Sequence, residues 1–227
     1  MNKQQEYRKL VGCRKECRDC GNGLVNQSSY PEFDSDEIGP WSRWQGNLDA
    51  DIMVVGQDWG NVDYFIKNNG IDNDAEHTCK NLVKRFMEIE IDIGTPSKPK
   101  QAPVFLTNSI LCLKPEEKSA NVLSKWQRNC CSKFLKPLIS IIKPKVVIAL
   151  GEKAYRAIMY LYGKKPKPFT VAVDNPVPVE LENGLCLFPV YHCSQQIINS
   201  GVRGETDQKR DWARILMREA NDNAVLS

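Results

Sequence analysis

Short apolar runs that alternate with amphipathic segments constrain the fold of this 227-residue chain more than any other feature. Several of the runs end in glycine and polar residues, which is typical of buried strands that lead into loops. Between them, apolar residues recur at helical spacing. The predicted strands are DIMVVGQD (51–58), VFLTNSIL (104–111), KPKVVIALG (143–151), FTVAV (169–173) and LCLFPVYH (185–192), and the predicted helices are 79–90, 121–142, 152–163 and 207–221.

This order predicts an α/β fold, a single three-layer α/β/α domain with a central, mostly parallel four-stranded sheet. We assign residues 1–48 to an N-terminal segment and loop that carry the first cysteines, 49–221 to the α/β core and 222–227 to a tail. Ligand sites of such folds lie at the carboxyl ends of the strands. Those ends read GQDWG, TNSILC, ALGEK and VYHCSQQ, and we expect the functional site there.

Composition narrows the class of protein. A hydrophobic fraction of 41% is that of a globular chain, and the longest apolar runs are too short to span a bilayer. The N-terminus MNKQQEYRKL lacks the apolar stretch of a signal peptide. We therefore expect a cytoplasmic monomer with no membrane association. A net charge of +3 permits DNA binding without requiring it.

Nine cysteines in a cytoplasmic chain indicate ligation or burial rather than disulfides. Three of them lie in CRKECRDC (13–20), whose C-x3-C-x2-C spacing is that of radical-SAM enzymes. No strand precedes this triplet, and Asp19 stands where such enzymes have an apolar or aromatic residue. Both departures argue against that chemistry.

The other cysteines suggest a different grouping. Cys17 and Cys20 form a close pair in a charged segment, Cys112 ends a predicted strand, and Cys130 and Cys131 lie on the next helix. Four thiolates from these segments suit zinc or an iron–sulfur cluster. Burial as small apolar side chains explains Cys79 and Cys186 better.

Taken together, the ordered pieces CRDC, VVGQDWG, TNSILCLKP, CSKFLKPLISIIKPKVVIALG and PVYHCS resemble the uracil-DNA glycosylase superfamily, nearest to its iron–sulfur family 4. The GQD of the first motif resembles family 1 instead. The resemblance implies a [4Fe-4S] cluster held by Cys17, Cys20, Cys112 and Cys131, because CSKFL matches the family pattern from Cys131. Cys13 or Cys130 could replace its neighbour as a ligand.

The same resemblance implies the catalytic residues. Asp58 would position the attacking water and stabilise the cationic sugar, while His192 would donate a hydrogen bond to the charge that develops on the base. Either residue could instead have a structural role, Asp58 as a cap and His192 as a buried side chain at a strand end.

Base recognition is assigned to the strand ends as well. The resemblance makes Asn108 the reader of the pyrimidine edge, with Gly56 and Gln57 beside it. Tyr64 or Phe65 could stack on the base, although core packing explains both equally well. Asn108 could alternatively cap a turn.

Two departures from the family bear on the substrate. Gly60 stands where family 1 has a tyrosine that blocks C5 of the pyrimidine, and family 4 also has glycine there. Cys193 follows His192 where the family has proline. An open C5 side could accept a modified pyrimidine of the kind found in phage DNA.

DNA contacts are expected from basic segments at 97–101, 164–168 and 201–210. Gln195, Gln196 and Arg203 are the wedge and phosphate candidates, since the family inserts a loop into the duplex after its His motif. Each basic run could equally be a solvated charged face.

We therefore expect a monofunctional DNA glycosylase that flips out uracil or a modified pyrimidine and excises it hydrolytically, leaving an abasic site, in repair or in phage defence. None of the positions assigned to catalysis or base contact is a lysine, so no Schiff base is expected. The alternatives are a catalytically inert iron–sulfur DNA-binding relative, a zinc-binding module and a radical-SAM enzyme.

Overall fold

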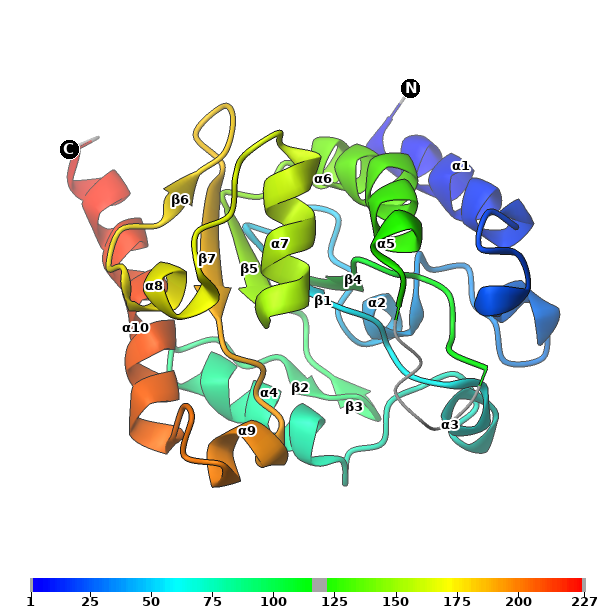
Figure 1. Cartoon of the computed structure of the whole chain (residues 1–227), viewed down its shortest axis with the longest axis horizontal. Helices are drawn as coiled ribbons and strands as arrows, with labels where there is room; N and C mark the ends of the chain where they lie inside the picture. The colour runs from blue at the N-terminus through cyan, green and yellow to red at the C-terminus, as the bar shows by residue number, and fades with distance from the viewer. Residues whose placement is uncertain (1, 116–121, 226–227) are drawn as a thin grey trace.

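Four parallel strands form the centre of the structure, a computed structural model that describes residues 2–115 and 122–225 (Figure 1). The short strand β6 pairs antiparallel with the last of them at one edge. The predicted α/β class is confirmed, and β6 makes the sheet five-stranded rather than four-stranded. The strands run in the order β4 (Val104–Asn108), β1 (Ile52–Gly56), β5 (Val146–Leu150), β7 (Cys186–Val190) and β6 (Val179–Glu180).

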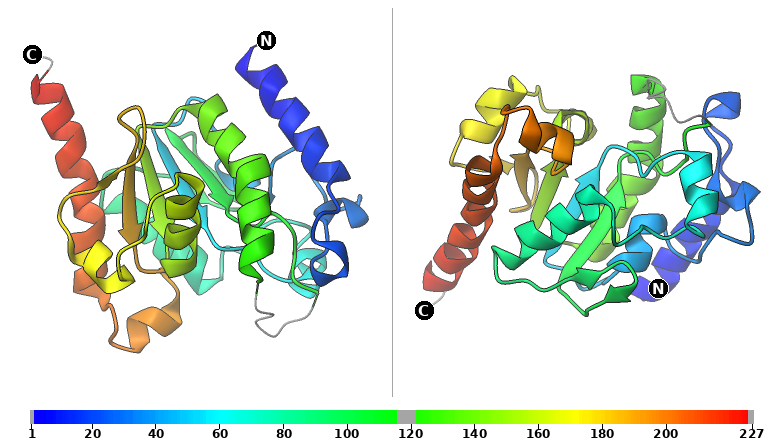
Figure 2. Two further views of the ribbon diagram at one scale, coloured as in Figure 1. Left: turned by 45° about the horizontal axis from the view of Figure 1, so that its top comes forward. Right: turned by 90° about the horizontal axis from the view of Figure 1, so that it is seen from below.

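Helices cover both faces of the sheet, which explains why its parallel strands are apolar throughout. Met53 and Val55 of β1 face one helix layer, whereas Ile52 and Val54 face the other. Figure 2 shows the two layers from two further directions. The first layer contains α1 (Lys3–Glu16), α6 (Lys136–Ile142) and α7 (Glu152–Leu161), and the second α2 (Pro40–Trp44), α4 (His77–Met87) and α10 (Glu205–Val225).

Smaller elements complete the chain. The predicted helix 121–142 is a continuous helical run from Ser124, with one π-helical turn in its middle, and position 121 lies outside the described residues. The remaining elements are short 3-10 turns at Gly21–Gly23 and Gln27–Ser29, α3 (Val62–Lys67), the hairpin of β2 (Gly94–Thr95) and β3 (Lys98–Pro99), α5 (Ser124–Cys130), the π turn Cys131–Leu135, α8 (Phe169–Asp174) and α9 (Gln195–Asn199).

The predicted strand 169–173 is wrong, because FTVAV forms the short helix α8. Ala172 and Val173 are buried while Val171 is exposed, which is the pattern of one helical face and not of an inner strand. The place beside β7 is taken by β6. Tertiary context has overridden the β-propensity of this segment.

Helix α1 was not predicted, although its start carries a capping box between Asn2 and Gln5. Few apolar residues mark its buried face. Near its end the buried Arg14 donates to both carboxylate oxygens of Asp34, at 2.8 and 3.0 Å. This ion pair fastens the loop that follows to the N-terminal helix.

The strand order makes β1 the topological switch point of the sheet. The chain moves from β1 to β4 on one side and then crosses to β5 on the other. Crevices at the carboxyl ends of strands form at such a point. Within the described residues, no helix is long and apolar enough to cross a bilayer.

We expect Arg14→Ala to lower the free energy of unfolding by about 3–5 kcal/mol, because it leaves the Asp34 carboxylate buried without its partner. Urea unfolding followed by circular dichroism measures this. Lys15→Ala removes the exposed pair with Asp36 and should leave the midpoint nearly unchanged. Equal effects of the two variants would contradict the role given to the buried pair.

Candidate active site

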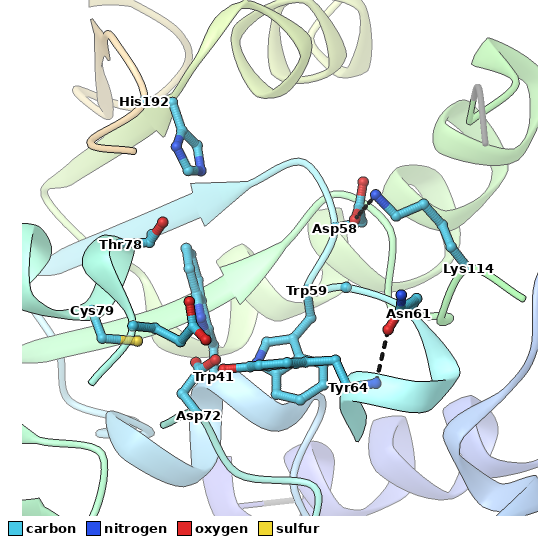
Figure 3. Close-up of a pocket in the computed structure, with 12 residues that line it drawn as sticks. Trp41, Asp58, Trp59, Asn61, Tyr64, Asp72, Thr78, Cys79, Lys114 and His192 are labelled. Carbon is cyan, nitrogen blue, oxygen red and sulfur yellow. Dashed lines mark hydrogen bonds and ion pairs between the residues drawn. The ribbon is translucent and has the colours of Figure 1, made fainter. Parts of the chain in front are cut away.

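A cavity of about 340 Å³ opens at the carboxyl ends of β1 and β7, where the sequence predicts the site (Figure 3). Polar groups and aromatic rings share its wall. The lining residues are Trp41, Asp58, Trp59, Gly60, Asn61, Tyr64, Asp72, Glu76, Thr78, Cys79, Lys114 and His192.

The loop after β1 is held in place by the segment after β4. The Ser109 N–H donates to the Gly56 carbonyl at 2.8 Å, and the Lys114 N–H donates to the Gly60 carbonyl at 2.9 Å. The parallel pairing of β1 and β4 is thus extended beyond the sheet. As a consequence, the side chains of Asp58 and Lys114 meet.

Asp58 has two fixed partners and is only 7% exposed. Lys114 Nζ lies 2.9 Å from its Oδ1, and the Gln57 side-chain amide donates to its Oδ2 at 2.8 Å. These two contacts fix the position of the Asp58 carboxyl group. Gln57 therefore orients Asp58 and does not line the cavity. Lys114 lies within the motif TNSILCLKP, but the sequence analysis gave it no role.

His192 enters the cavity from the end of β7 (Figure 3). Its Nδ1 accepts a hydrogen bond from the Ser194 N–H at 3.1 Å, so that Nδ1 carries no proton. Burial lowers the pKa of His192, and the charge of Asp58 offsets this only in part. A neutral imidazole with its proton on Nε2 can donate a hydrogen bond into the cavity.

Asn108 lies beside Gly56 across the β1–β4 pairing. It is only 4% exposed, and its Oδ1 has no hydrogen-bond partner. A Cβ atom at Gly56 would lie 2.4 Å from this oxygen and 3.1 Å from the Trp41 ring. Only glycine therefore allows the amide to approach β1 so closely. Asn108 adjoins the Trp41 wall and is not itself among the lining residues.

Tyr64 and Phe65, the two residues expected to stack on the base, have different environments in the structure. Tyr64 lines the cavity, with its ring centroid 5.0 Å from that of Trp59. Phe65 is 1% exposed and packs against Phe33 and Trp59, so it belongs to the core and is not positioned to stack on a base. The sequence analysis missed Trp41 and Trp59, although Trp59 lies within the motif GQDWG itself.

The DNA-contact candidates also differ in their surroundings. Gln195 and the exposed Gln196 begin α9, three and four residues after His192, and neither is among the lining residues of the cavity. Arg203 is 11% exposed and donates to Asp211 at 2.7 and 2.8 Å and to Asp174 at 2.9 Å. Its guanidinium group is thus engaged within the protein, which speaks against a phosphate contact. The neighbouring Val202, which the sequence analysis did not consider, is 57% exposed.

Four cysteines converge away from this cavity. Cys17, Cys20, Cys112 and Cys130 line a small enclosed space of about 20 Å³. A thiol–thiol hydrogen bond to Cys112 lowers the pKa of Cys20. Within the described residues, no three His, Cys, Asp or Glu side chains have the spacing that a single metal ion needs. The donor set, four sulfurs from three segments, fits a thiolate-ligated cluster.

The adjacent cysteines of the long helix point in different directions. Cys130 faces the other three sulfurs, whereas Cys131 packs in the core and its thiol donates to the Ser109 carbonyl at 3.5 Å. Cys13 is exposed on α1 and does not line this space. Of the alternatives left open by the sequence, the structure brings Cys130 to the group and leaves Cys13 outside it.

Backbone pairing holds the cysteine segments together. Val25 and Leu113 exchange two hydrogen bonds of 2.8 Å, which join the segment after Cys20 to the segment after Cys112. The Asn26 side chain donates to the Cys17 carbonyl at 2.8 Å. The cysteine group lies beyond the end of β4, whereas the cavity of Asp58 and His192 lies at the ends of the neighbouring strand β1 and of β7.

The model of the uracil-DNA glycosylase superfamily matches residues 44–216, and the chain belongs to this family of hydrolases. A type-5 uracil-DNA glycosylase of Pyrobaculum aerophilum is 25% identical over 202 residues, 82% of this chain and 80% of its own length. Type-4 enzymes of Thermotoga maritima and Sulfurisphaera tokodaii are 24% and 26% identical over 68% and 70% of this chain, and over 70% and 66% of their own lengths. The similarity thus includes type 5 as well as the predicted type 4.

Stability should depend on the protonation of His192. Because burial lowers its pKa in the folded state, the unfolded chain binds the proton more readily below about pH 6.5. Stability therefore falls as the pH falls through that value. We expect His192→Gln to reduce this slope in urea unfolding between pH 7.5 and pH 5, whereas His77→Gln, at an exposed position, should retain it. An unchanged slope in the His192 variant would contradict a buried neutral imidazole.

Proposed function

We propose that this protein is a monofunctional DNA glycosylase that flips uracil or a modified pyrimidine out of DNA and excises it by hydrolysis, leaving an abasic site. The observation that carries the proposal is the meeting of Asp58 and His192, from the ends of β1 and β7, in one cavity. A base must leave the stack for its glycosidic bond to be reached, and a cavity of this size can receive it.

The chemistry divides between these two residues. In hydrolysis the bond between the sugar C1′ and the base nitrogen breaks and its electron pair stays on the base. A water oxygen bonds to C1′, and the proton that this water loses balances the negative charge of the released base. Asp58, held in position by Lys114, would stabilise the positive charge on the sugar and orient the water. The His192 Nε2–H would donate to the base oxygen on which negative charge collects.

Recognition of the base is assigned to Asn108 and Tyr64. The unpartnered Asn108 Oδ1 would accept a hydrogen bond from a donor on the pyrimidine edge. Tyr64, with Trp59 beside it, would stack on the ring. Gly56 acts by leaving room for the Asn108 amide.

Contact with the duplex is proposed for the start of α9. Gln195 and Gln196 follow His192 by three and four residues and would contact the strand whose base enters the cavity. The exposed Val202 is an apolar side chain of the type that proteins insert between base steps. We assign Arg203 to positioning this loop through Asp174 and Asp211.

The cysteine group is proposed to hold a [4Fe-4S] cluster, with Cys130 in place of Cys131 as the fourth ligand. Such a cluster would crosslink the N-terminal segment to the segment after β4 and to the long helix, and no step of the hydrolysis runs through it. Relatives named as type-4 enzymes support an iron–sulfur rather than a zinc centre.

The first test is release of a free base, identified by mass spectrometry, from DNA that contains uracil or modified pyrimidines in single and double strands. We expect Asp58→Asn to lower the rate about 10²–10⁴-fold and His192→Gln about 10²–10³-fold. Asp36→Asn, at an exposed carboxylate far from the cavity, is the matched control. If no substrate releases a free base although the metal centre of the protein is intact, the result would favour the inert DNA-binding relative.

Borohydride trapping tests the monofunctional mechanism. Lys114 lies in the cavity, but its side-chain nitrogen is engaged in an ion pair with Asp58. We therefore expect no covalent adduct between protein and DNA under reducing conditions. A trapped adduct that Lys114→Arg removes would make the protein a lyase as well.

Metal content tests the ligand assignment. Cys130→Ser should lose most of the iron and visible absorption of the wild-type protein, because its thiol faces the other three. Cys131→Ser and Cys13→Ser should keep both. Loss in Cys131→Ser with retention in Cys130→Ser would reverse the assignment, and zinc without iron would replace the cluster by a zinc site.

A further inference from the structure

Asp72 lies across the cavity from the Asp58–Lys114 pair, and no step of the proposed hydrolysis uses it (Figure 3). Its Oδ2 atom is buried, although the residue as a whole is half-buried. A carboxylate oxygen without access to solvent costs free energy unless donors reach it. The role of Asp72 therefore depends on what faces this oxygen inside the protein.

Aromatic side chains of the cavity wall face the Asp72 carboxyl group, and Figure 3 shows it beside the rings of Trp41 and Tyr64. Burial raises the pKa of Asp72 to about 6, and hydrogen bonds from the side chains of Trp59, Trp41 and Tyr64 act in the opposite direction. A carboxylate only accepts hydrogen bonds and an indole N–H only donates them. The carboxyl group and the rings are therefore complementary.

The Trp59 indole N–H depends on Asp72 more than the other donors do. Both the indole nitrogen and Asp72 Oδ2 are buried, and neither has a hydrogen-bond partner elsewhere in the described part of the chain. Unpaired buried polar atoms cost free energy. The ring orientation that directs this N–H toward Asp72 is therefore favoured over orientations that direct it elsewhere.

Tyr64 is held by the same carboxyl group. Its hydroxyl oxygen accepts a hydrogen bond from the Asn73 N–H at 3.3 Å, which leaves the hydroxyl proton for donation to Asp72. The ring centroids of Trp59 and Tyr64 lie 5.0 Å apart. Asp72 thus contacts two adjacent rings of the cavity wall, one of which is assigned to stacking on the base.

The loop that carries Asp72 is anchored on both sides. After it, the Asp74 carboxylate accepts a hydrogen bond of 2.9 Å from the Ser97 N–H, in the turn between β2 and β3. Before it, Arg43 donates to the Gly70 carbonyl at 3.1 Å. The Asp72 carboxyl group is therefore presented to the rings from a fixed position.

We propose that Asp72 is a positioning residue, which orients the rings of Trp59 and Tyr64 so that they stack on a base in the cavity. This inference rests on the proposed function and deepens it by assigning a support to the base-binding wall. Stacking acts on the bound base before and during bond cleavage, so it stabilises the ground state and the transition state alike. Loss of ring orientation should therefore weaken binding and leave the chemical step unchanged.

The test measures single-turnover release of uracil from DNA, or of the modified pyrimidine that the release assay identifies. Asp72→Asn keeps the shape of the side chain but replaces one acceptor by a donor. We expect it to raise the half-saturating DNA concentration about tenfold and to change the maximal rate less than about threefold. A merely structural role would lower the active fraction of the protein without changing the half-saturating concentration.

Two controls separate orientation from charge and from loop stability. Removal of a carboxylate reduces repulsion of the DNA phosphates, so charge alone should tighten binding and not weaken it. Glu76→Gln, at an exposed carboxylate that lines the same cavity, measures this effect. Asp74→Asn, in the same loop but bound to the β2–β3 turn, should leave the half-saturating concentration unchanged.

A double-mutant cycle identifies the rings through which Asp72 acts. Trp59→Phe removes the indole N–H and Tyr64→Phe removes the hydroxyl group, while both variants keep an aromatic ring. In the background of these two changes, we expect Asp72→Asn to weaken binding by less than about twofold, because its partners are already absent. A full tenfold loss in that background would overturn the inference and leave the proposed function intact.

Equilibrium binding distinguishes failure of the inference from failure of the proposed function. The preference of the protein for uracil-containing DNA over otherwise identical thymine-containing DNA measures capture of the base without bond cleavage. If no base is released but Asp72→Asn abolishes this preference and Glu76→Gln retains it, the inference stands and the proposed function fails. An equal preference in the wild-type protein and in Asp72→Asn, or none in either, would reject the inference.

Discussion

The parallel pairing of β1 with β4, continued past the sheet, is the constraint on which both functional regions depend. The segment that leaves β4 carries Asn108, Cys112 and Lys114 within a few residues. Its hydrogen bonds to the loop after β1 bring Lys114 to Asp58, and its pairing with Val25 brings Cys112 to the N-terminal cysteines. One extended segment thus links the candidate active site to the cysteine group.

Electrostatics gives the ionisable groups of the cavity different roles. Asp58 meets an ammonium group and an amide donor, which fix its carboxyl group in place. His192 is buried beside a backbone donor, which favours the neutral ring. Burial raises the pKa of Asp72 to about 6, although hydrogen bonds from the side chains of Trp59, Trp41 and Tyr64 act in the opposite direction. Groups of different electrostatic character therefore surround one space.

Much of the fold could be predicted because buried parallel strands are apolar throughout and leave a strong local signal, as in VVIAL and VFLTN. Helix α1 left a weak signal, since Tyr7, Leu10 and Val11 are its few apolar contacts and Arg14 contributes through a buried ion pair. FTVAV gave a misleading signal, because short apolar runs fit a strand or a helix equally well until their neighbours are known.

The sequence by itself determined the α/β class, the positions of the strand ends and the presence there of Asp58, Asn108 and His192, because these depend on local order along the chain. Only the tertiary structure decided which side chains meet. Cys130 and Cys131 are neighbours in sequence, yet about 100° of helical rotation turns one to the other sulfurs and the other to the core. Likewise, the docking of distant loops unites Lys114 with Asp58, occupies Arg203 with two carboxylates and gathers Asp72 with the aromatic rings. Such contacts join residues far apart in the chain, and no local pattern encodes them.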